Sequence, residues 1–528
     1  GVAPGAQLAD LAALQHLDAA LAIEDLAPLA VGAARHGVVQ AVEGDRRTEL
    51  VLHAVRGDLE LHRADRGEHG CLVTSQVRAQ DLDDAFLLEL FDPAAELLVA
   101  AGILRPRARE VLGGERRDRR IGEGRLEVRR VAGAQRTRVA PADDVTGVGG
   151  WPTPAVSCSL EPYGKQAGVM ITGSHNPPQY NGFKLSRGHG TIYGTEIQKL
   201  RGIIEQGVFP KGEGKVTTAD PIPAYMDHIA GDIKVKRPLK VVVDAGNGVG
   251  GMVTPGLLRR LGCEVIELYC DLDGNFPNHF PDPTVPANLE DLIATVAREG
   301  ADLGISLDGD ADRIGAVADD GSIIWGDQLM ILFARDILEF HPGGTIIFEV
   351  KCSQALIEDI EAHGGKPLMW KTGHSLIEAK IREEKALLAG EMSGHIYFAD
   401  RYYGYDDAIY AACRLVEFIA RKGVKLSELL ADIPRYYATP ELRIESTDEE
   451  KFQIVDAVKQ EFLQDHDVID IDGVRVVFPD GWGLVRASNT SPVVVVRCEA
   501  KTPERRDEIQ EMIMSKLKQF PSVAANLK

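Results

Sequence analysis

The stretch Ala167-Gly-Val-Met-Ile-Thr-Gly-Ser-His-Asn-Pro-Pro178 organises the sequence that follows position 150. Its first half, 168–171, is a short apolar run that predicts a buried strand, and the turn formers after it must end that strand. Ser174 therefore presents its hydroxyl from a stiff backbone, beside peptide N–H groups and His175. Because unpaired N–H dipoles in a turn bind anions, Ser174 is a candidate carrier of a phosphoryl group. The alternative is an ordinary solvated turn.

A second apolar run leads directly into Asp308, Asp310 and Asp312, with Arg313 adjacent. Carboxylates spaced two residues apart in an extended loop point to one side, where they would repel one another without a shared cation. Ligation by oxygen alone favours Mg²⁺ over zinc. A calcium-binding EF-hand loop is the rival, but its twelfth position holds Asp319 rather than Glu. A solvated acidic turn is the simplest alternative.

A glycine-rich turn follows the predicted strand that begins at Leu239. Gly246, Gly248 and Gly251 match the G-x-G-x-x-G pattern, and Glu267 lies about twenty residues beyond the first glycine. This is the fingerprint of dinucleotide binding. Glycines are also common in any tight turn between a strand and a helix, so we interpret these as structural and keep the dinucleotide-binding oxidoreductase as an alternative.

Strands and helices then alternate up to about residue 435, which indicates α/β domains with ligand groups at the strand ends. Lys351 and His374 each follow a predicted strand. From about Thr439 the order strand–helix–strand–strand–helix indicates a smaller α+β domain. Its predicted hairpin loop, 481–490, places a guanidinium fork, Arg486, near small hydrogen-bond donors, a combination that suits phosphate.

The bulk composition is that of a globular protein, with 44% hydrophobic and 26% charged residues. A formal net charge of −21 argues against nucleic acid or an anionic membrane as the main partner. The seven cysteines show no metal-binding spacing, and no apolar run is long enough to span a bilayer. We therefore expect a cytoplasmic protein without nucleic-acid or membrane partners.

The first 150 residues differ from the rest in composition. They contain nineteen Arg but no Lys, Asn, Tyr, Met or Trp. Selection for a fold would not remove these unrelated residues together, whereas a GC-rich reading frame would. We therefore interpret 1–150 as an aberrant Ala/Arg-rich segment, either mistranslated or poorly ordered; the alternative is a genuine Ala/Arg-rich extension.

In their order along the chain, these motifs resemble those of the α-D-phosphohexomutases, the phosphomannomutase/phosphoglucomutase family. The matching blocks are the Ser174 loop with Asn181-Gly-Phe-Lys184, the aspartate loop 308–313, Gly390-Glu-Met-Ser-Gly-His395 and the segment 481–490. The resemblance covers roughly 150–525. The family's N-terminal Tyr-Asp-Ile-Arg-Gly-type segment has no counterpart in 1–150.

The resemblance implies a multi-domain α/β fold: three α/β mixed-sheet domains, the first incomplete or aberrant, and a C-terminal α+β domain around a central cleft. The expected domains are 151–222 with the phosphoserine loop, 223–322 with the metal loop, 323–435 with the sugar-recognition loop and 436–528 with the phosphate clamp.

The same resemblance implies an isomerase that interconverts hexose 1-phosphate and 6-phosphate of mannose or glucose. Phosphorylated Ser174 would be the nucleophile, Arg313 would neutralise charge, and His175 and Lys184 would transfer or orient protons. Mg²⁺ would bind Asp308, Asp310, Asp312 and the phosphoryl group on Ser174. Substrate contacts would come from Lys351, His374, Glu391, Met392, Ser393, Gly394, His395, Arg486, Ala487, Ser488, Asn489 and Thr490.

The expected partners are small-molecule hexose phosphates, with hexose 1,6-bisphosphate as activator and intermediate, and the expected state is a monomer. Besides the dinucleotide-binding oxidoreductase, two alternatives remain. A phosphoglucosamine mutase would share the same chemistry, and an inactive sugar-phosphate-binding protein would follow if 1–150 replaces part of the first domain.

Overall fold

The computed structural model describes residues 38–43, 46–55, 58–66, 72–78 and 144–526, except 161, 178–179, 189, 208–213 and 490. Thr490 therefore lies outside the described residues. Within 1–150, the described strands are β1 (Val38–Glu43), β2 (Arg46–Val55), β3 (Asp58–Arg66), β4 (Leu72–Arg78) and β5 (Val145–Gly147), of which β1–β4 form an antiparallel sheet. That sheet belongs to one compact unit, and residues 144–202 and 216–526 belong to another. The interpretation of 1–150 as an aberrant segment stays a prediction.

The strand predicted at 168–171 is present as β6 (Ala167–Ile171), but the prediction that it is buried is wrong, since Val169 is 41% exposed. β6 is the edge strand of the three-stranded sheet β6-β7-β8 and, among the described residues, pairs with β7 alone. Neighbouring elements are α6 (Thr153–Ser159), β7 (Phe183–Arg187), β8 (Gly190–Thr191), α7 (Thr195–Gln206) and β9 (Val216–Thr218), which pairs with β5.

The next domain contains a mixed five-stranded sheet in the order β11-β10-β12-β13-β14. Strand β10 is parallel to both of its neighbours, and β13 returns antiparallel to β12. The aspartate loop is the connection between β12 and β13, at the carboxyl end of a fully buried strand. The elements are α8 (Ile222–Asp232), β10 (Lys240–Asp244), η2 (Val249–Met252), α9 (Thr254–Arg260), β11 (Glu264–Leu268), η3 (Pro286–Leu289), α10 (Glu290–Glu299), β12 (Leu303–Leu307), β13 (Ile314–Ala318) and β14 (Ile323–Ile324).

The third domain repeats this plan with the strand order β16-β15-β17-β18. The central strand β15 is parallel to β16 and β17, so three strand ends meet at one edge. The elements are α11 (Gly326–Phe340), β15 (Thr345–Glu349), α12 (Gln354–Ala362), β16 (Lys366–Trp370), α13 (His374–Glu384), β17 (Leu388–Gly390), β18 (Ile396–Phe398), α14 (Ala408–Lys422) and α15 (Leu426–Leu429).

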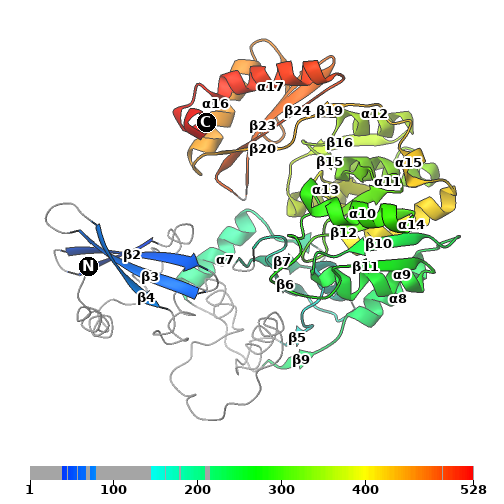
Figure 1. Ribbon diagram of the computed structural model, residues 1–528, viewed down its shortest axis with the longest axis horizontal. Coiled ribbons are helices and arrows are strands. Elements are labelled where there is room, and N and C mark those ends of the chain that lie inside the picture. The colour runs from blue at the N-terminus through cyan, green and yellow to red at the C-terminus, as the bar shows by residue number, and fades with distance from the viewer. Residues whose placement is uncertain are drawn as a thin grey trace. The chain divides into compact units, whose positions relative to one another are not determined.

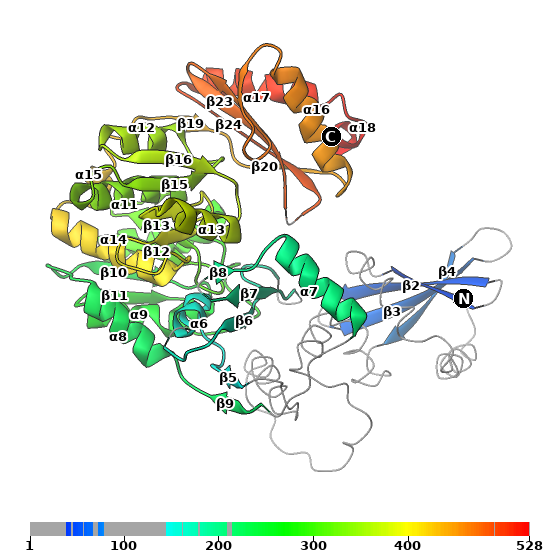
Figure 2. The same cartoon turned by 180° about the vertical axis from the view of Figure 1, so that it is seen from behind.

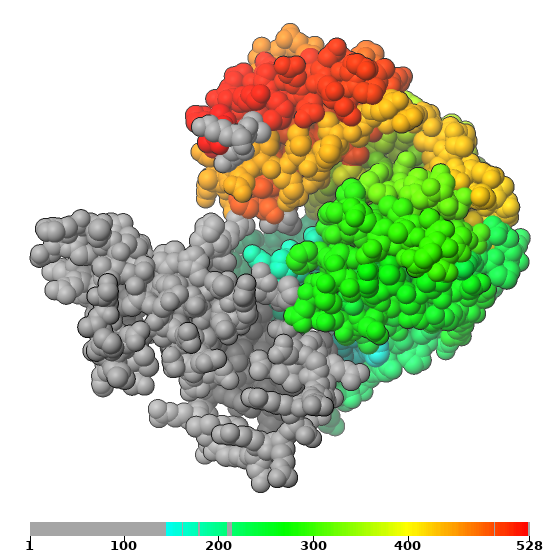
Figure 3. All heavy atoms as spheres, viewed as in Figure 1, coloured from blue at the N-terminus to red at the C-terminus, as the bar shows by residue number. Residues whose placement is uncertain are grey.

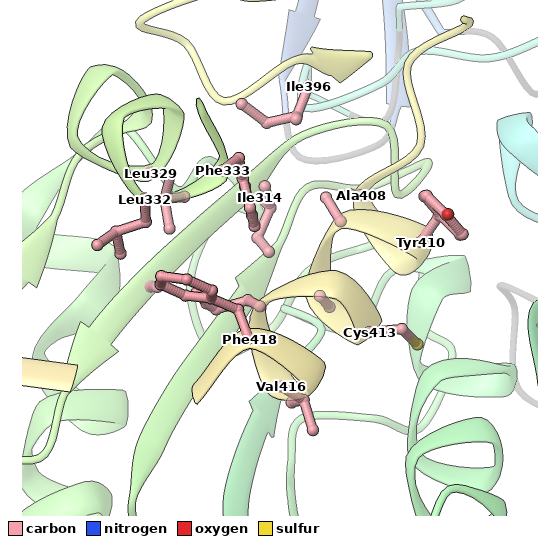
Figure 4. Close-up of a cluster of buried hydrophobic side chains, with 14 of the residues drawn as sticks. Ile314, Leu329, Leu332, Phe333, Ile396, Ala408, Tyr410, Cys413, Val416 and Phe418 are labelled. Atoms are coloured by element: carbon pink, nitrogen blue, oxygen red, sulfur yellow. The ribbon is translucent and has the colours of Figure 1, made fainter. Parts of the chain in front are cut away.

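The second and third domains share one hydrophobic core. Figure 4 shows Ile314 of β13 near Phe333 of α11 and Phe418 of α14. Helix α14 is buried over nearly its whole length, because apolar residues cover most of its surface. The two domains accordingly form one continuous body, green to yellow in Figure 3.

The C-terminal domain places α16 and α17 against one face of an antiparallel sheet (Figures 1 and 2). The prediction of a hairpin loop at 481–490 is wrong for 481–487, which form a buried strand, β23. A Cβ on Gly483 would meet Ile509 and Ile513 of α17, and a Cβ on Gly481 would meet the Glu499 carbonyl oxygen of β24 as well as Ile509. The elements are β19 (Tyr437–Ala438), β20 (Leu442–Glu445), α16 (Glu450–Phe462), β21 (Asp467–Ile469), β22 (Val474–Phe478), β23 (Gly481–Ala487), β24 (Val493–Ala500), α17 (Pro503–Leu517) and α18 (Pro521–Asn526).

The predicted fold class is confirmed: mixed-sheet α/β domains precede a C-terminal α+β domain. Within the part of the chain that the structure describes, no helix combines the length and apolarity that crossing a membrane requires.

Candidate active site

The serine loop and the aspartate loop are in direct contact. The Ser174 hydroxyl donates a hydrogen bond to Asp308 Oδ2 at 2.8 Å, and the Ser174 N–H donates to Thr172 Oγ1 at 2.8 Å. Ser174 has a φ of 52°, a left-handed conformation that costs a non-glycine residue free energy. Gly309 permits this approach, because a Cβ there would lie 2.1 Å from the Ser174 carbonyl oxygen.

The three aspartates converge as their spacing predicted. Asp308, Asp310 and Asp312 are buried, and one carboxylate oxygen from each lies within 4.8 Å of the others. Asp310 Oδ1 and Asp312 Oδ1 are buried with no hydrogen-bond partner among the described residues. Burial together with the two neighbouring carboxylates raises the pKa of Asp308 to about 8. The group offers only oxygen ligands, two of which have no hydrogen-bond partner among the described residues, so it fits a hard divalent cation such as Mg²⁺.

Two cations of the chain itself border these carboxylates. Lys184 Nζ pairs with Asp310 Oδ2 at 3.0 Å and also contacts Asp312 Oδ2. Although burial opposes its charge, these two carboxylates hold the Lys184 pKa well above its usual value, so the side chain is an ammonium. Arg313 is buried and donates from Nε to Asp308 Oδ2 at 3.1 Å. Arg313 thus shares Asp308 Oδ2 with the Ser174 hydroxyl, and Lys184 borders the other two carboxylates.

His175 lies beside the serine. Its Nδ1 is 3.2 Å from Ser174 Oγ, and its Nε2 is 3.8 Å from Asp282 Oδ2. Burial, with help from Arg313, lowers the pKa of His175 to about 4, so the imidazole is neutral near pH 7. Asp282 also accepts a hydrogen bond from Arg313 Nη1 at 3.3 Å and thereby touches both side chains.

The loop between β17 and β18 brings Glu391, Met392, Ser393, Gly394 and His395 to the aspartate loop. The Ile314 N–H donates to the Gly394 carbonyl at 3.0 Å. Gly394 has a φ of 95°, and a Cβ there would lie 2.4 Å from the Ile314 carbonyl oxygen, so only glycine fits. The predicted sugar-recognition loop therefore lies directly against the predicted metal loop.

Two histidines extend this cluster. His395 Nδ1 is 2.8 Å from Asp406 Oδ2 and 3.7 Å from Asp312 Oδ1. Burial opposes the charge on His395, but Asp312 and Asp406 raise its pKa to about 9. The ring of His374 stacks at 6.3 Å from that of His395, and burial lowers the pKa of His374.

Among the remaining predicted substrate residues, Lys351 and Arg486 each pair with a carboxylate. Lys351 Nζ lies 3.1 Å from Glu441 Oε2. Arg486, at the end of β23, donates from Nε to Asp472 Oδ2 at 3.0 Å, and the same oxygen accepts from the Thr372 N–H at 3.1 Å. Asp472 thus links Arg486 to the turn that precedes His374. The adjoining residues of the predicted clamp are Ala487, buried at the end of β23, Ser488, also buried, and Asn489, which is exposed.

The glycine-rich turn supports the aspartate loop. A Cβ on Gly248 would lie 2.7 Å from the Gly309 carbonyl oxygen, and the Val249 N–H donates to that oxygen at 3.0 Å. Glu267, the expected ribose partner of a dinucleotide, forms an ion pair with Arg259. The space that a pyrophosphate would need is filled by the chain's own backbone, which favours the structural interpretation of these glycines.

Sequence reasoning missed several members of the cluster. Thr153 and Thr172 donate to Asp310 Oδ2 at 2.8 and 2.9 Å. Asp282 and Asp406 contact the basic residues described above. Only Asp282 carried a local signal, as the acidic residue within a Pro-Asp-Pro turn.

Family models match along the chain. The models of phosphoglucomutase/phosphomannomutase alpha/beta/alpha domains I, II and III match 117–211, 223–321 and 325–437, and the C-terminal domain model matches 441–516. The chain therefore belongs to the phosphoglucomutase/phosphomannomutase family. The domain I match begins at 117 and so includes residues upstream of position 150.

Individual relatives agree with this family. A phosphomannomutase/phosphoglucomutase of Pseudomonas aeruginosa is 48% identical over 379 residues, which cover 72% of this chain and 82% of the relative. A protein named as a phosphoglucosamine mutase, from Methanopyrus kandleri, is 36% identical over 70% of this chain and 82% of its own. A crystal structure of a phosphoglucomutase/phosphomannomutase family protein from Burkholderia thailandensis superposes with a TM-score of 0.71, at 39% identity, over 84% of this chain and 95% of that one.

Proposed function

We propose that this protein is a phosphohexomutase that interconverts hexose 1-phosphate and hexose 6-phosphate, with mannose or glucose as the sugar. The observation that carries the proposal is the contact of the Ser174 hydroxyl with Asp308, at 2.8 Å, beside two buried carboxylate oxygens, Asp310 Oδ1 and Asp312 Oδ1, that have no hydrogen-bond partner among the described residues. The names of the relatives favour mannose and glucose, since the identity is 48% to a phosphomannomutase/phosphoglucomutase but 36% to a phosphoglucosamine mutase.

In the proposed reaction Ser174 carries a phosphoryl group. A free sugar hydroxyl attacks the phosphorus, the new P–O bond forms, and the bond from phosphorus to Ser174 Oγ breaks. The hydroxyl proton leaves to a nearby base, and the resulting hexose 1,6-bisphosphate returns its other phosphoryl group to Ser174. Each cycle therefore regenerates the phosphoserine and consumes no other donor.

Charge neutralisation is the main requirement of phosphoryl transfer. Arg313 and the Lys184 ammonium lie beside Ser174 and its carboxylates and would bind the oxygens of the transferred group. His175 lies 3.2 Å from Ser174 Oγ, which suits an orienting group; its lowered pKa makes it a weak proton acceptor near pH 7. Asp308, Asp310 and Asp312 would hold Mg²⁺, which when bound supplies further neutralisation of the phosphoryl oxygens.

The sugar and its second phosphate would bind to the third and fourth domains. Glu391 and Ser393 offer hydrogen bonds to adjacent sugar hydroxyls, and Lys351 and His374 lie at neighbouring strand ends. The segment that begins at Arg486 would hold the phosphate that does not react. A clamp for phosphate, together with a loop for hydroxyls, would let one site accept both orientations of the sugar.

The test is a coupled mutase assay on the full chain with Mg²⁺ and a trace of glucose 1,6-bisphosphate, using mannose 1-phosphate and glucose 1-phosphate in turn. Turnover of either substrate is expected, and Ser174→Ala should abolish it while thermal unfolding stays unchanged. Ser515→Ala, on the exposed side of α17, is the matched control and should keep full activity. Unchanged turnover in Ser174→Ala would refute the assignment of the nucleophile. Binding of hexose phosphate without turnover would favour the inactive sugar-phosphate-binding alternative.

A further inference from the structure

Glu349 lies at the carboxyl end of the central strand of the third domain. Its strand, β15, runs between the parallel neighbours β16 and β17. The carboxyl ends of the three strands therefore meet at one edge, and the segments that follow them are neighbours. Each segment carries a predicted substrate residue: Lys351 after β15, His374 after β16, and the loop 391–395 after β17.

The Glu349 side chain contacts all three segments. It is fully buried, and its Oε2 accepts from the Lys351 N–H at 2.7 Å and from Thr372 Oγ1 at 3.0 Å. Its Oε1 accepts from the Met392 N–H at 3.2 Å. Hydrogen bonds to a carboxylate are stronger than neutral ones, and inside a protein an unpaired donor is costly, so each segment is held firmly.

The sugar-recognition loop is held from a second side as well. Glu391 Oε1 accepts from the Gly373 N–H at 2.7 Å, and Ser393 Oγ donates to Glu391 Oε2 at 3.1 Å. The turn before His374 therefore orients the Glu391 carboxylate. Glu349 holds the same turn through its hydrogen bond with Thr372. Glu349 itself is covered by protein and would not touch the sugar.

We propose that Glu349 is a positioning residue that sets the geometry of the sugar-recognition loop relative to Lys351 and the 371–374 turn. It would thereby determine how strongly the site prefers a hexose phosphate over phosphate alone. This inference rests on the proposed function, because it assigns Glu391 and Ser393 to the sugar hydroxyls and Arg486 to the phosphate.

Glu349→Gln tests the two carboxylate oxygens, Oε1 and Oε2, separately. A glutamine has one acceptor oxygen and one NH₂ group. The oxygen is expected to take the place of Oε2, where it faces two donors, the Lys351 N–H and the Thr372 hydroxyl. The NH₂ group would then face the Met392 N–H, donor against donor, and release the sugar loop selectively. Lys351 and Thr372 would keep their acceptor.

The experiment is calorimetric titration of the full chain with glucose 6-phosphate and, separately, with inorganic phosphate. All proteins carry Ser174→Ala, so that no phosphoryl transfer perturbs the heats. With Glu349 intact, glucose 6-phosphate should bind more tightly than phosphate. Glu349→Gln should reduce that preference about tenfold, the effect of losing one hydrogen bond of about 1.4 kcal/mol. It should not weaken the binding of phosphate, because it removes an anion that lies 3.9 Å from Lys351 Nζ.

Two controls accompany the variant. Glu361→Gln removes the same charge from the exposed face of α12 and should change neither affinity. Thr372→Val removes one donor from Oε2 and should reduce the preference by less, with rescue in Thr372→Ser. This second pair keeps the test decisive if Glu349→Gln does not fold.

The outcomes separate the inference from the proposed function. An unchanged preference in Glu349→Gln, or an equal loss of affinity for both ligands, would overturn the role of Glu349. If the chain with Glu349 intact binds glucose 6-phosphate no better than phosphate, the proposed function itself fails.

Discussion

Thr172→Val is the substitution that tests most directly how the serine loop and the aspartate loop are coupled. The Thr172 hydroxyl donates to Asp310 Oδ2 at 2.9 Å and accepts from the Ser174 N–H at 2.8 Å. Valine has nearly the same shape but neither donates nor accepts. The substitution therefore removes one polar link between Ser174, the proposed nucleophile, and Asp310, a proposed metal ligand, and leaves the packing intact.

The expected magnitude follows from the partners that remain. A hydrogen bond to a charged group contributes about 1.5–3 kcal/mol. Asp310 keeps Thr153 and Lys184 as partners, so we take the lower end of that range, about 1.5–2 kcal/mol. That corresponds to a roughly 10- to 30-fold weaker apparent affinity for Mg²⁺. The affinity for hexose phosphate should stay constant, because Thr172 contacts none of the proposed sugar residues.

The assay measures mutase rate against Mg²⁺ concentration, with Mn²⁺ binding followed by electron paramagnetic resonance as a readout independent of turnover. Thr172→Ser, which keeps the hydroxyl, should restore most of the affinity. Thr218→Val, on the exposed strand β9, controls for a threonine-to-valine change elsewhere. Unaltered Mg²⁺ activation in Thr172→Val would refute the coupling, and equal impairment in Thr172→Ser would assign the effect to methyl packing.

Three further predictions concern the same site. Lys184→Met removes the ammonium from Asp310 and Asp312. Mg²⁺ should therefore bind more tightly in a calorimetric titration, while turnover falls at least tenfold. Weaker Mg²⁺ binding would contradict this prediction. Glu441→Gln removes the carboxylate that competes with the substrate for Lys351. Glucose 6-phosphate should then bind a few-fold more tightly, which is roughly the contribution of a partly exposed ion pair. An unchanged affinity for glucose 6-phosphate would place Lys351 outside the site. Gly309→Ala should abolish turnover and lower the unfolding temperature, because its Cβ would lie 2.1 Å from the Ser174 carbonyl oxygen, and an active, stable variant would show that the two loops need not touch.

The parts of the site that follow one another closely in the chain could be predicted from the sequence. The three aspartates converge because they share one short loop after a buried strand, so their spacing alone determines their proximity. The placement of Lys351 and His374 has a similar cause, since each follows the carboxyl end of one of two adjacent parallel strands. The strand predicted to precede His374 is present as β16.

The parts that depend on long-range pairing could not be predicted. Asp406 stands beside Asp407 in a Tyr-rich stretch that matches no ligand motif, and only the fold brings it to His395. Glu349 ends a hydrophobic strand, where a single carboxylate gives no signal of the three donors around it. The glycines of β23 are typical of a loop when only the sequence is considered. In the structure they leave room for the side chains of α17.

The loop 391–395 connects the two halves of the proposed chemistry. Its Gly394 carbonyl accepts from the Ile314 N–H, next to Arg313, while its Met392 N–H is held by Glu349. Main-chain hydrogen bonds fix the loop to the aspartate loop on one side and to the third-domain sheet on the other. A displacement of residues 391–395 would therefore strain the contact to the aspartate loop, and Gly394 leaves no room for a Cβ there. Under the proposed function, this five-residue segment would couple sugar binding to phosphoryl transfer.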